Sequence, residues 1–129
     1  MKAGDTFLYP LQPPNTEHLW IVATNPNADG AVLIVNVTTM HSFDKDHIDG
    51  TVCLNQGEHI FLTEKHSYVY YRGAQIKKIS ELENEKSAGM LKPQPPCSKT
   101  VIDLVRSGFN ASEHCQKGIR RFYEQSKNL

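Results

Sequence analysis

Histidine is the residue whose type and spacing most clearly indicate chemistry in this chain. Five of the six histidines fall within the first 66 residues. Four of them stand beside a charged residue, in the pairs Glu17-His18, Asp46-His47, Glu58-His59 and Lys65-His66. Because the pKa of an unperturbed imidazole is about 6.5, such groups can accept or donate a proton near neutral pH.

Histidines beside hydroxyls and a lysine suit proton transfer around a phosphodiester. One group takes the proton of a ribose 2′-hydroxyl, another protonates the leaving oxygen, and cationic donors stabilise the phosphate charge. Use of the 2′-hydroxyl restricts such a site to RNA. We take His18 and His59 as acid/base candidates, and Lys65 and His66 as candidate RNA contacts.

The aromatic segment that follows His66 adds candidate contacts to unpaired bases. It contains Tyr68, Tyr70, Tyr71 and Arg72. Tyrosine rings stack on bases, and arginine supplies a cation. The alternative is that alternate tyrosines belong to the core and the histidines are scattered over the surface. The residues alone leave both interpretations open.

Other chemistries have weaker sequence signals. Within residues 41–50 the acidic and histidine side chains resemble a metal site, but EF-hand spacing counted from Asp44 puts Ile48 at position 5 and Asn55 at position 12. A solvated acidic loop without a metal cofactor is the preferred interpretation, and a metal-dependent hydrolase is a third hypothesis. The chain has no GxSxG, glycine-rich phosphate loop or HExxH motif.

The elements that must position these groups are mostly strands. The β-prone runs span residues 6–9, 18–24, 31–39, 51–54, 59–62 and 67–72, and residues 74–79 lead toward a polar helix over 80–88. Turn residues at 25–30 predict a hairpin between the second and third runs. The start of one strand then lies beside the end of the other, which brings His18 and Thr38 to one rim.

The last third of the chain has a helical pattern. Pro93, Pro95 and Pro96 interrupt the strands. Ser98 is the expected N-cap of a helix over 99–106, which Gly108 ends. Asn110 and Glu113 are spaced as a capping box for a last helix over 111–125. Its apolar face is expected to hold Cys115, Ile119, Phe122 and Tyr123.

Length and composition limit the class of protein. A chain of 129 residues with 39% hydrophobic and 22% charged residues fits one globular domain. We expect no membrane segment and no secretory signal, and three cysteines without a CxxC pair fit small core residues in a reducing cytoplasm. The net charge of zero is unevenly distributed along the chain. Residues 1–59 contain two basic and seven acidic residues, whereas residues 60–129 contain twelve basic and seven acidic residues.

Together these patterns predict a mainly β fold with C-terminal helices. Residues 1–90 would form a small, strongly bent antiparallel β-barrel, and residues 91–129 an α-helical hairpin that extends the same domain.

The order of these pieces resembles the MazF/PemK family of SH3-like-barrel toxins and, more loosely, the non-enzymatic CcdB proteins. The resemblance covers about residues 3–85. It rests on the opening Gly4-Asp5 and the strand that follows, on the apolar run 19–22, and on the segment 36–39. The family carries a catalytic Arg before its second strand, where this chain has Glu17-His18.

The resemblance implies a metal-independent endoribonuclease that cleaves single-stranded RNA in a type II toxin–antitoxin system. It implies a homodimer, a cognate antitoxin protein as partner, and a catalytic role for Thr38, with Glu17 and Thr39 beside the RNA. His18 would take over acid/base or phosphate-binding work. The alternative is a non-catalytic SH3-like module that binds protein or nucleic acid, with the C-terminal helices as its interaction surface.

Overall fold

The computed structural model describes residues 1–11, 16–39, 49–59, 62 and 66–129. Within them, the strands are β1 (Thr6–Leu11), β2 (Thr16–Val22), β3 (Ala31–Thr39), β4 (Cys53–Asn55), β5 (His66–Lys78) and β6 (Lys92–Gln94). The helices are α1 (Ile79–Ser87), α2 (Lys99–Ala111) and α3 (Lys117–Ser126).

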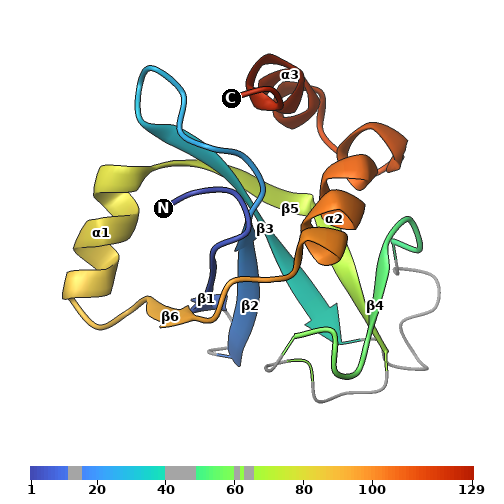
Figure 1. Cartoon of the computed structure of the whole chain (residues 1–129), viewed down its shortest axis with the longest axis horizontal. Helices are drawn as coiled ribbons and strands as arrows, with labels where there is room; N and C mark the ends of the chain where they lie inside the picture. Colours follow the sequence, from blue (N-terminus) through green and yellow to red (C-terminus); the bar gives the residue numbers. More distant parts are fainter. Residues whose placement is uncertain (12–15, 40–48, 60–61, 63–65) are drawn as a thin grey trace.

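The strands form one curled antiparallel sheet in the order β4-β5-β3-β2-β1-β6. Helix α1 lies on one side of it, and α2 and α3 lie on the other (Figure 1). The predicted class, mainly β with helices at the C-terminal end, is confirmed.

The predicted hairpin of β2 and β3 is confirmed, with Leu19 paired to Val37 and Val22 to Ile34. Its connection is held by the Asn27 side chain, whose Oδ1 accepts from the backbone N–H of Asp29 and of Ala31. Gly30, at φ +71°, supplies the left-handed residue of the turn. The turn chemistry of the sequence therefore fixes which ends of β2 and β3 meet.

Side-chain alternation gives the sheet two buried faces. The face toward α1, called here the α1 face, carries Phe7, Trp20, Val22, Val32 and Ile34, which pack with Leu82 and Leu91. The opposite face, called the α2/α3 face, carries Leu19, Ile21, Leu33, Val35, Val37, Val69 and Tyr71.

An aromatic column joins the sheet to both C-terminal helices. The Tyr71 ring meets Phe109 edge-on at 5.0 Å, and Phe109 stacks on Tyr123 at 5.1 Å. The Tyr71 hydroxyl donates to the Val105 carbonyl at 2.7 Å. A Cβ at Gly108 would lie 1.8 Å from the Tyr71 hydroxyl. Gly108 therefore allows a close approach inside α2 and does not end the helix as predicted.

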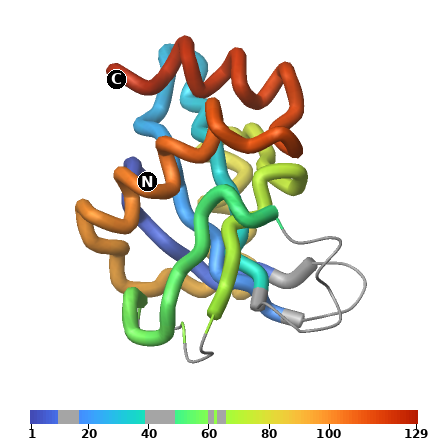
Figure 2. The backbone as a smooth tube through the Cα atoms, turned by 90° about the vertical axis from the view of Figure 1, so that its right-hand side faces the viewer, coloured from blue at the N-terminus to red at the C-terminus, as the bar shows by residue number. Residues whose placement is uncertain are grey.

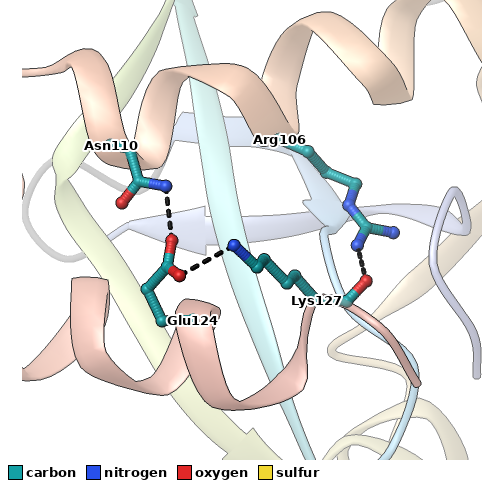
Figure 3. Close-up of polar contacts among 4 residues, drawn as sticks. All are labelled: Arg106, Asn110, Glu124 and Lys127. Atoms are coloured by element: carbon teal, nitrogen blue, oxygen red, sulfur yellow. Dashed lines mark hydrogen bonds and ion pairs between the residues drawn. The ribbon is translucent and has the colours of Figure 1, made fainter.

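The helix caps were predicted in part. Ser98 caps α2 as expected, since its Oγ accepts from the backbone N–H of Val101 at 3.2 Å. Asn110 is not a cap: it lies inside α2, and its side chain donates to Glu124 of α3 (Figure 3). Arg106 of α2 donates to the Lys127 carbonyl, so this contact and the Asn110–Glu124 bond fasten α3 to α2, while Glu124 pairs with Lys127 at 2.8 Å at the end of α3 itself.

The proline-containing segment forms a short strand that was not predicted. Strand β6 pairs with β1 through Thr6–Gln94, Phe7–Pro93 and Leu8–Lys92. Pro93 fits because β6 is an edge strand. The sheet thus extends past residue 90, and α2 and α3 share one core with its strands.

The C-terminal helix returns to the β2–β3 connection at one end of the molecule (Figure 2). There the Asn25 side chain donates to the Leu129 carbonyl at 2.7 Å. Among the helices of the described residues, none is both long enough and apolar enough to cross a membrane.

Candidate active site

The two hairpin residues proposed for catalysis lie on the same face of the sheet. Trp20 pairs with Asn36 on the α1 face, and Leu19 pairs with Val37 on the opposite face. His18 and Thr38 are the next residues outward along the two strands, so both return to the α1 face. Both side chains are half-buried. The pairing of β2 with β3 ends at Leu19 and Val37, so this imidazole and this hydroxyl lie on the same face just beyond the last pair.

Thr38 is oriented by a buried amide. The Asn36 Nδ2 donates to the Thr38 Oγ1 at 3.1 Å, and Asn36 is fully buried. Because the hydroxyl oxygen accepts this bond, its proton points elsewhere and can be donated to a phosphate oxygen. Asn36 is two residues from Thr38, but it was not among the site residues predicted from the sequence. Their spacing of two residues in a strand was the signal for this contact.

Tyrosines flank the pair on both sides. Tyr9 is paired with His18, and Tyr68 with Thr38. Tyr70 lies beside Tyr68, ring to ring at 6.5 Å with an interplanar angle of 86°. Burial raises the pKa of Tyr9, and the hydrogen-bonded Glu85 carboxylate raises it further. Tyr9 beside His18, and Thr38 beside Tyr68, are together called the row here, and they place one imidazole, one aliphatic hydroxyl and two phenols on this face.

A β-bulge shapes the row at Tyr70. The register of β3 against β5 shifts between Ile34 and Asn36. A Cβ at Gly73 would lie 2.7 Å from the Tyr70 ring and 3.3 Å from the Asn36 Oδ1. Glycine is thus what lets the Tyr70 ring and the Asn36 amide occupy their places.

His59 lies away from His18. Its ring is only 6% exposed. Its Nε2 is 3.1 Å from the Thr6 Oγ1 and 2.8 Å from the Pro95 carbonyl. Thr6 pairs with Ile21, a residue of the α2/α3 face. The structure therefore does not bring the two candidate acid/base histidines together.

Glu17 and Arg72 also point away from the row. Glu17 alternates with His18 and forms an ion pair with Lys92 of β6 at 2.7 Å. The Arg72 Nη2 is 2.9 Å from the His114 Nδ1, in the connection between α2 and α3. Neither contact had a local sequence signal, because each partner is more than 40 residues away along the chain.

His66 shares the α1 face with Tyr68, two residues further along β5. It is exposed, and its Nδ1 is 3.3 Å from the Asn55 Oδ1. For Thr39 the structure describes only the backbone, which pairs with Ser67. Lys65 lies outside the described residues.

Most of the acidic segment, residues 41–48, also lies outside the described residues. Within the described part of the chain, no three His, Cys, Asp or Glu side chains are grouped to hold a metal. Asp49, predicted to be solvated, is 3% exposed and accepts from the Ser112 hydroxyl at 2.6 Å. Cys115 is buried as expected, whereas Cys53 is exposed.

Comparison of the chain with known protein families, curated proteins and solved structures finds no match. The MazF/PemK resemblance therefore stays a prediction.

Proposed function

We propose that the α1 face around His18 and Thr38 is the active site of a metal-independent endoribonuclease acting on single-stranded RNA. One observation carries the proposal: His18 and Thr38 share a face, and Asn36 holds the Thr38 hydroxyl with its proton free to donate. This supplies a proton acceptor and an oriented donor for a phosphodiester.

The reaction needs one proton carrier and one hydrogen-bond donor. His18 removes the proton of the ribose 2′-hydroxyl, and the 2′-oxygen attacks the adjacent phosphorus. The bond from phosphorus to the 5′-oxygen breaks on the opposite side of the phosphorus, where a water molecule protonates that oxygen, and His18 releases its proton to solvent. Thr38 donates to a non-bridging oxygen as its negative charge grows. The products are a 2′,3′-cyclic phosphate and a 5′-hydroxyl.

The tyrosines explain a preference for unpaired RNA. Tyr9 and Tyr70 are half-buried and offer stacking surfaces to splayed bases, whereas Tyr68 is buried and packs edge-on against Tyr70. The exposed His66 extends the same face outward and is assigned to contact the strand. His59, Glu17 and Arg72 have no part in this version of the site, because their partners lie elsewhere.

The wider biology is proposed from the family resemblance. The chain would act in the cytoplasm as the toxin of a type II toxin–antitoxin pair, as a homodimer neutralised by a small antitoxin protein. Growth inhibition on expression, relieved by co-expression of a neighbouring small open reading frame, is the expected behaviour.

The direct test is cleavage of a fluorescent single-stranded RNA by the pure protein in EDTA. We expect cyclic-phosphate ends, and no cleavage of the same RNA with 2′-O-methyl groups. Binding of both RNAs without cleavage would establish the alternative, a non-catalytic module. Activity that requires added metal would refute the mechanism.

A further inference from the structure

The reaction proposed above needs a proton for the leaving 5′-oxygen as well as a base for the 2′-hydroxyl. In an in-line displacement the attacking and leaving oxygens lie on opposite sides of the phosphorus, so one imidazole does not serve both. His59, the second acid/base candidate of the sequence, is buried against Thr6 and Pro95. An acid supplied by the protein must therefore be another side chain of the α1 face.

His66 lies on the other side of Thr38 from His18. Strand β3, which carries Thr38, is between β2, which carries His18, and β5, which carries His66. Thr38 pairs with Tyr68, and His66 is the next residue outward along β5 on the α1 face. Neighbouring strands are about 4.8 Å apart, so β2 and β5 are separated by roughly 10 Å. A phosphate bound at Thr38 thus has a histidine-bearing strand on each side.

The contact of His66 with β4 determines which ring nitrogen is available. Asn55 pairs with His66 in the ladder between β4 and β5, and the Asn55 Oδ1 is 3.3 Å from the His66 Nδ1. An amide oxygen only accepts, so Nδ1 carries the proton of this hydrogen bond. Nε2 is then the nitrogen that gains and loses a proton, which imidazole does near neutral pH. The side chain is exposed, so a substrate oxygen can reach it.

We propose that His66 is the general acid of the reaction and gives its Nε2 proton to the leaving 5′-oxygen. His18 takes the proton of the 2′-hydroxyl, and the 2′-oxygen forms its bond to phosphorus. The bond from phosphorus to the 5′-oxygen breaks as His66 protonates that oxygen. His18 ends protonated and His66 neutral, and proton exchange with water restores both. His66 thus replaces the water of the mechanism above, and its role rests on the proposed function.

A substrate whose leaving group needs no proton tests this role. The linkage that the wild-type protein cleaves fastest is mapped in a single-stranded RNA, and the same RNA is made with sulfur in place of the 5′-oxygen there. A thiolate leaves without being protonated. We therefore expect His66→Ala to lower the single-turnover rate on the ordinary linkage about 10²-fold or more, and to cleave the sulfur linkage at close to the wild-type rate. His18→Ala should lose activity on both linkages, because both need the 2′-hydroxyl proton removed.

The matched control is the same substitution at another exposed histidine. His114 lies in the connection between α2 and α3, and His114→Ala should leave both rates unchanged. Equal losses on the two linkages in His66→Ala, or no loss on the ordinary one, would overturn the assignment of the acid and keep the nuclease. No cleavage of either RNA by the wild-type protein would refute both proposals.

The ring tautomer gives a readout that does not depend on activity. In a ¹⁵N-correlated NMR spectrum of the histidine rings, neutral His66 is expected to be protonated at Nδ1, and Asn55→Ala is expected to reduce this preference. Neutral His66 protonated mainly at Nε2 in the wild-type protein would contradict the Asn55 contact and overturn the proposed orientation of the acid.

Discussion

Thr38 differs from another threonine of the sheet in the use of its hydroxyl. The Thr6 Oγ1 donates its proton to the Pro95 carbonyl at 2.7 Å. The Thr38 Oγ1 instead accepts from Asn36 and keeps its proton for a further acceptor. The same residue type thus has a structural role at one position and is available for chemistry at the other.

Replacing Thr38 with valine tests this role at the scale of one residue. Thr38→Val keeps the β-branched shape and removes the donor. We expect kcat for RNA cleavage to fall about 10²–10³-fold, the usual effect of losing one donor to a developing oxyanion. Thr100→Val, at an exposed position of α2, is the control and should leave kcat unchanged. Wild-type kcat in Thr38→Val would remove Thr38 from the mechanism.

At the residue scale, sequence reasoning succeeded where the relevant contact was local. His18 and Thr38 could be related because a short turn fixes which ends of β2 and β3 meet. His59 could not be placed, because its partners Thr6 and Pro95 lie 53 and 36 residues away. In the sequence alone, a histidine that links β1 to the segment after β6, as His59 does, cannot be told from a catalytic histidine.

At the scale of elements, the two glycines of the C-terminal helices differ in their surroundings: Gly108 is closely packed and Gly118 is not. Gly108 lies against the Tyr71 hydroxyl, whereas a Cβ at Gly118 would meet nothing within 4 Å. The sequence pattern treated Gly108 as a helix end because glycine commonly follows one. Only the packing of α2 on the sheet shows why the helix continues through it.

The two glycines give a matched pair of variants. Gly108→Ala should destabilise the protein by about 1–3 kcal/mol, since the added methyl forces α2 away from Tyr71. Gly118→Ala should raise stability by roughly 0.5–1 kcal/mol, because alanine orders a helix better. Urea unfolding measures both changes. Equal effects of the two substitutions would contradict the described docking of α2.

Elements with a strong local sequence pattern were predicted well. Elements whose structure depends on contacts with distant segments of the chain were not. Strand β3 was predicted over its full length because its apolar run is continuous. Strand β6 was missed because Lys92–Gln94 becomes a strand only by pairing with β1. Asn110 was assigned as a cap because its partner, Glu124, belongs to the next helix.

At the scale of the whole molecule, Asp49 ties the segment before β4 to the corner between α2 and α3. Its Oδ1 accepts from the Thr51 N–H at 3.0 Å, and its Oδ2 accepts from the Ser112 hydroxyl. Burial alone would raise the pKa of this carboxyl, but the hydrogen bonds from Ser112 and Thr51 outweigh burial and lower the pKa. The charged form therefore stabilises the fold.

This link predicts an acid-sensitive part of the stability. Because the pKa of Asp49 is lower in the folded state than its ordinary value of 3.8, its contribution is complete above that pH and is lost as the pH falls through the folded value. Asp49→Asn should cost about 1–3 kcal/mol at pH 7, and the difference from wild type should shrink below about pH 4. Asp29→Asn, at an exposed turn, is the control. A difference independent of pH would exclude this role.

The central claim is that His18 and Thr38 act as one unit on RNA, and a double-mutant cycle tests it most directly. Cleavage of a single-stranded RNA in EDTA would be measured for wild type, His18→Ala, Thr38→Val and the double variant, with circular dichroism confirming the fold of each. We expect each single variant to lose at least about 10²-fold in kcat, and the double variant to lose much less than the product of the two. Cleavage at the wild-type rate by His18→Ala, or strictly multiplicative losses, would contradict the account.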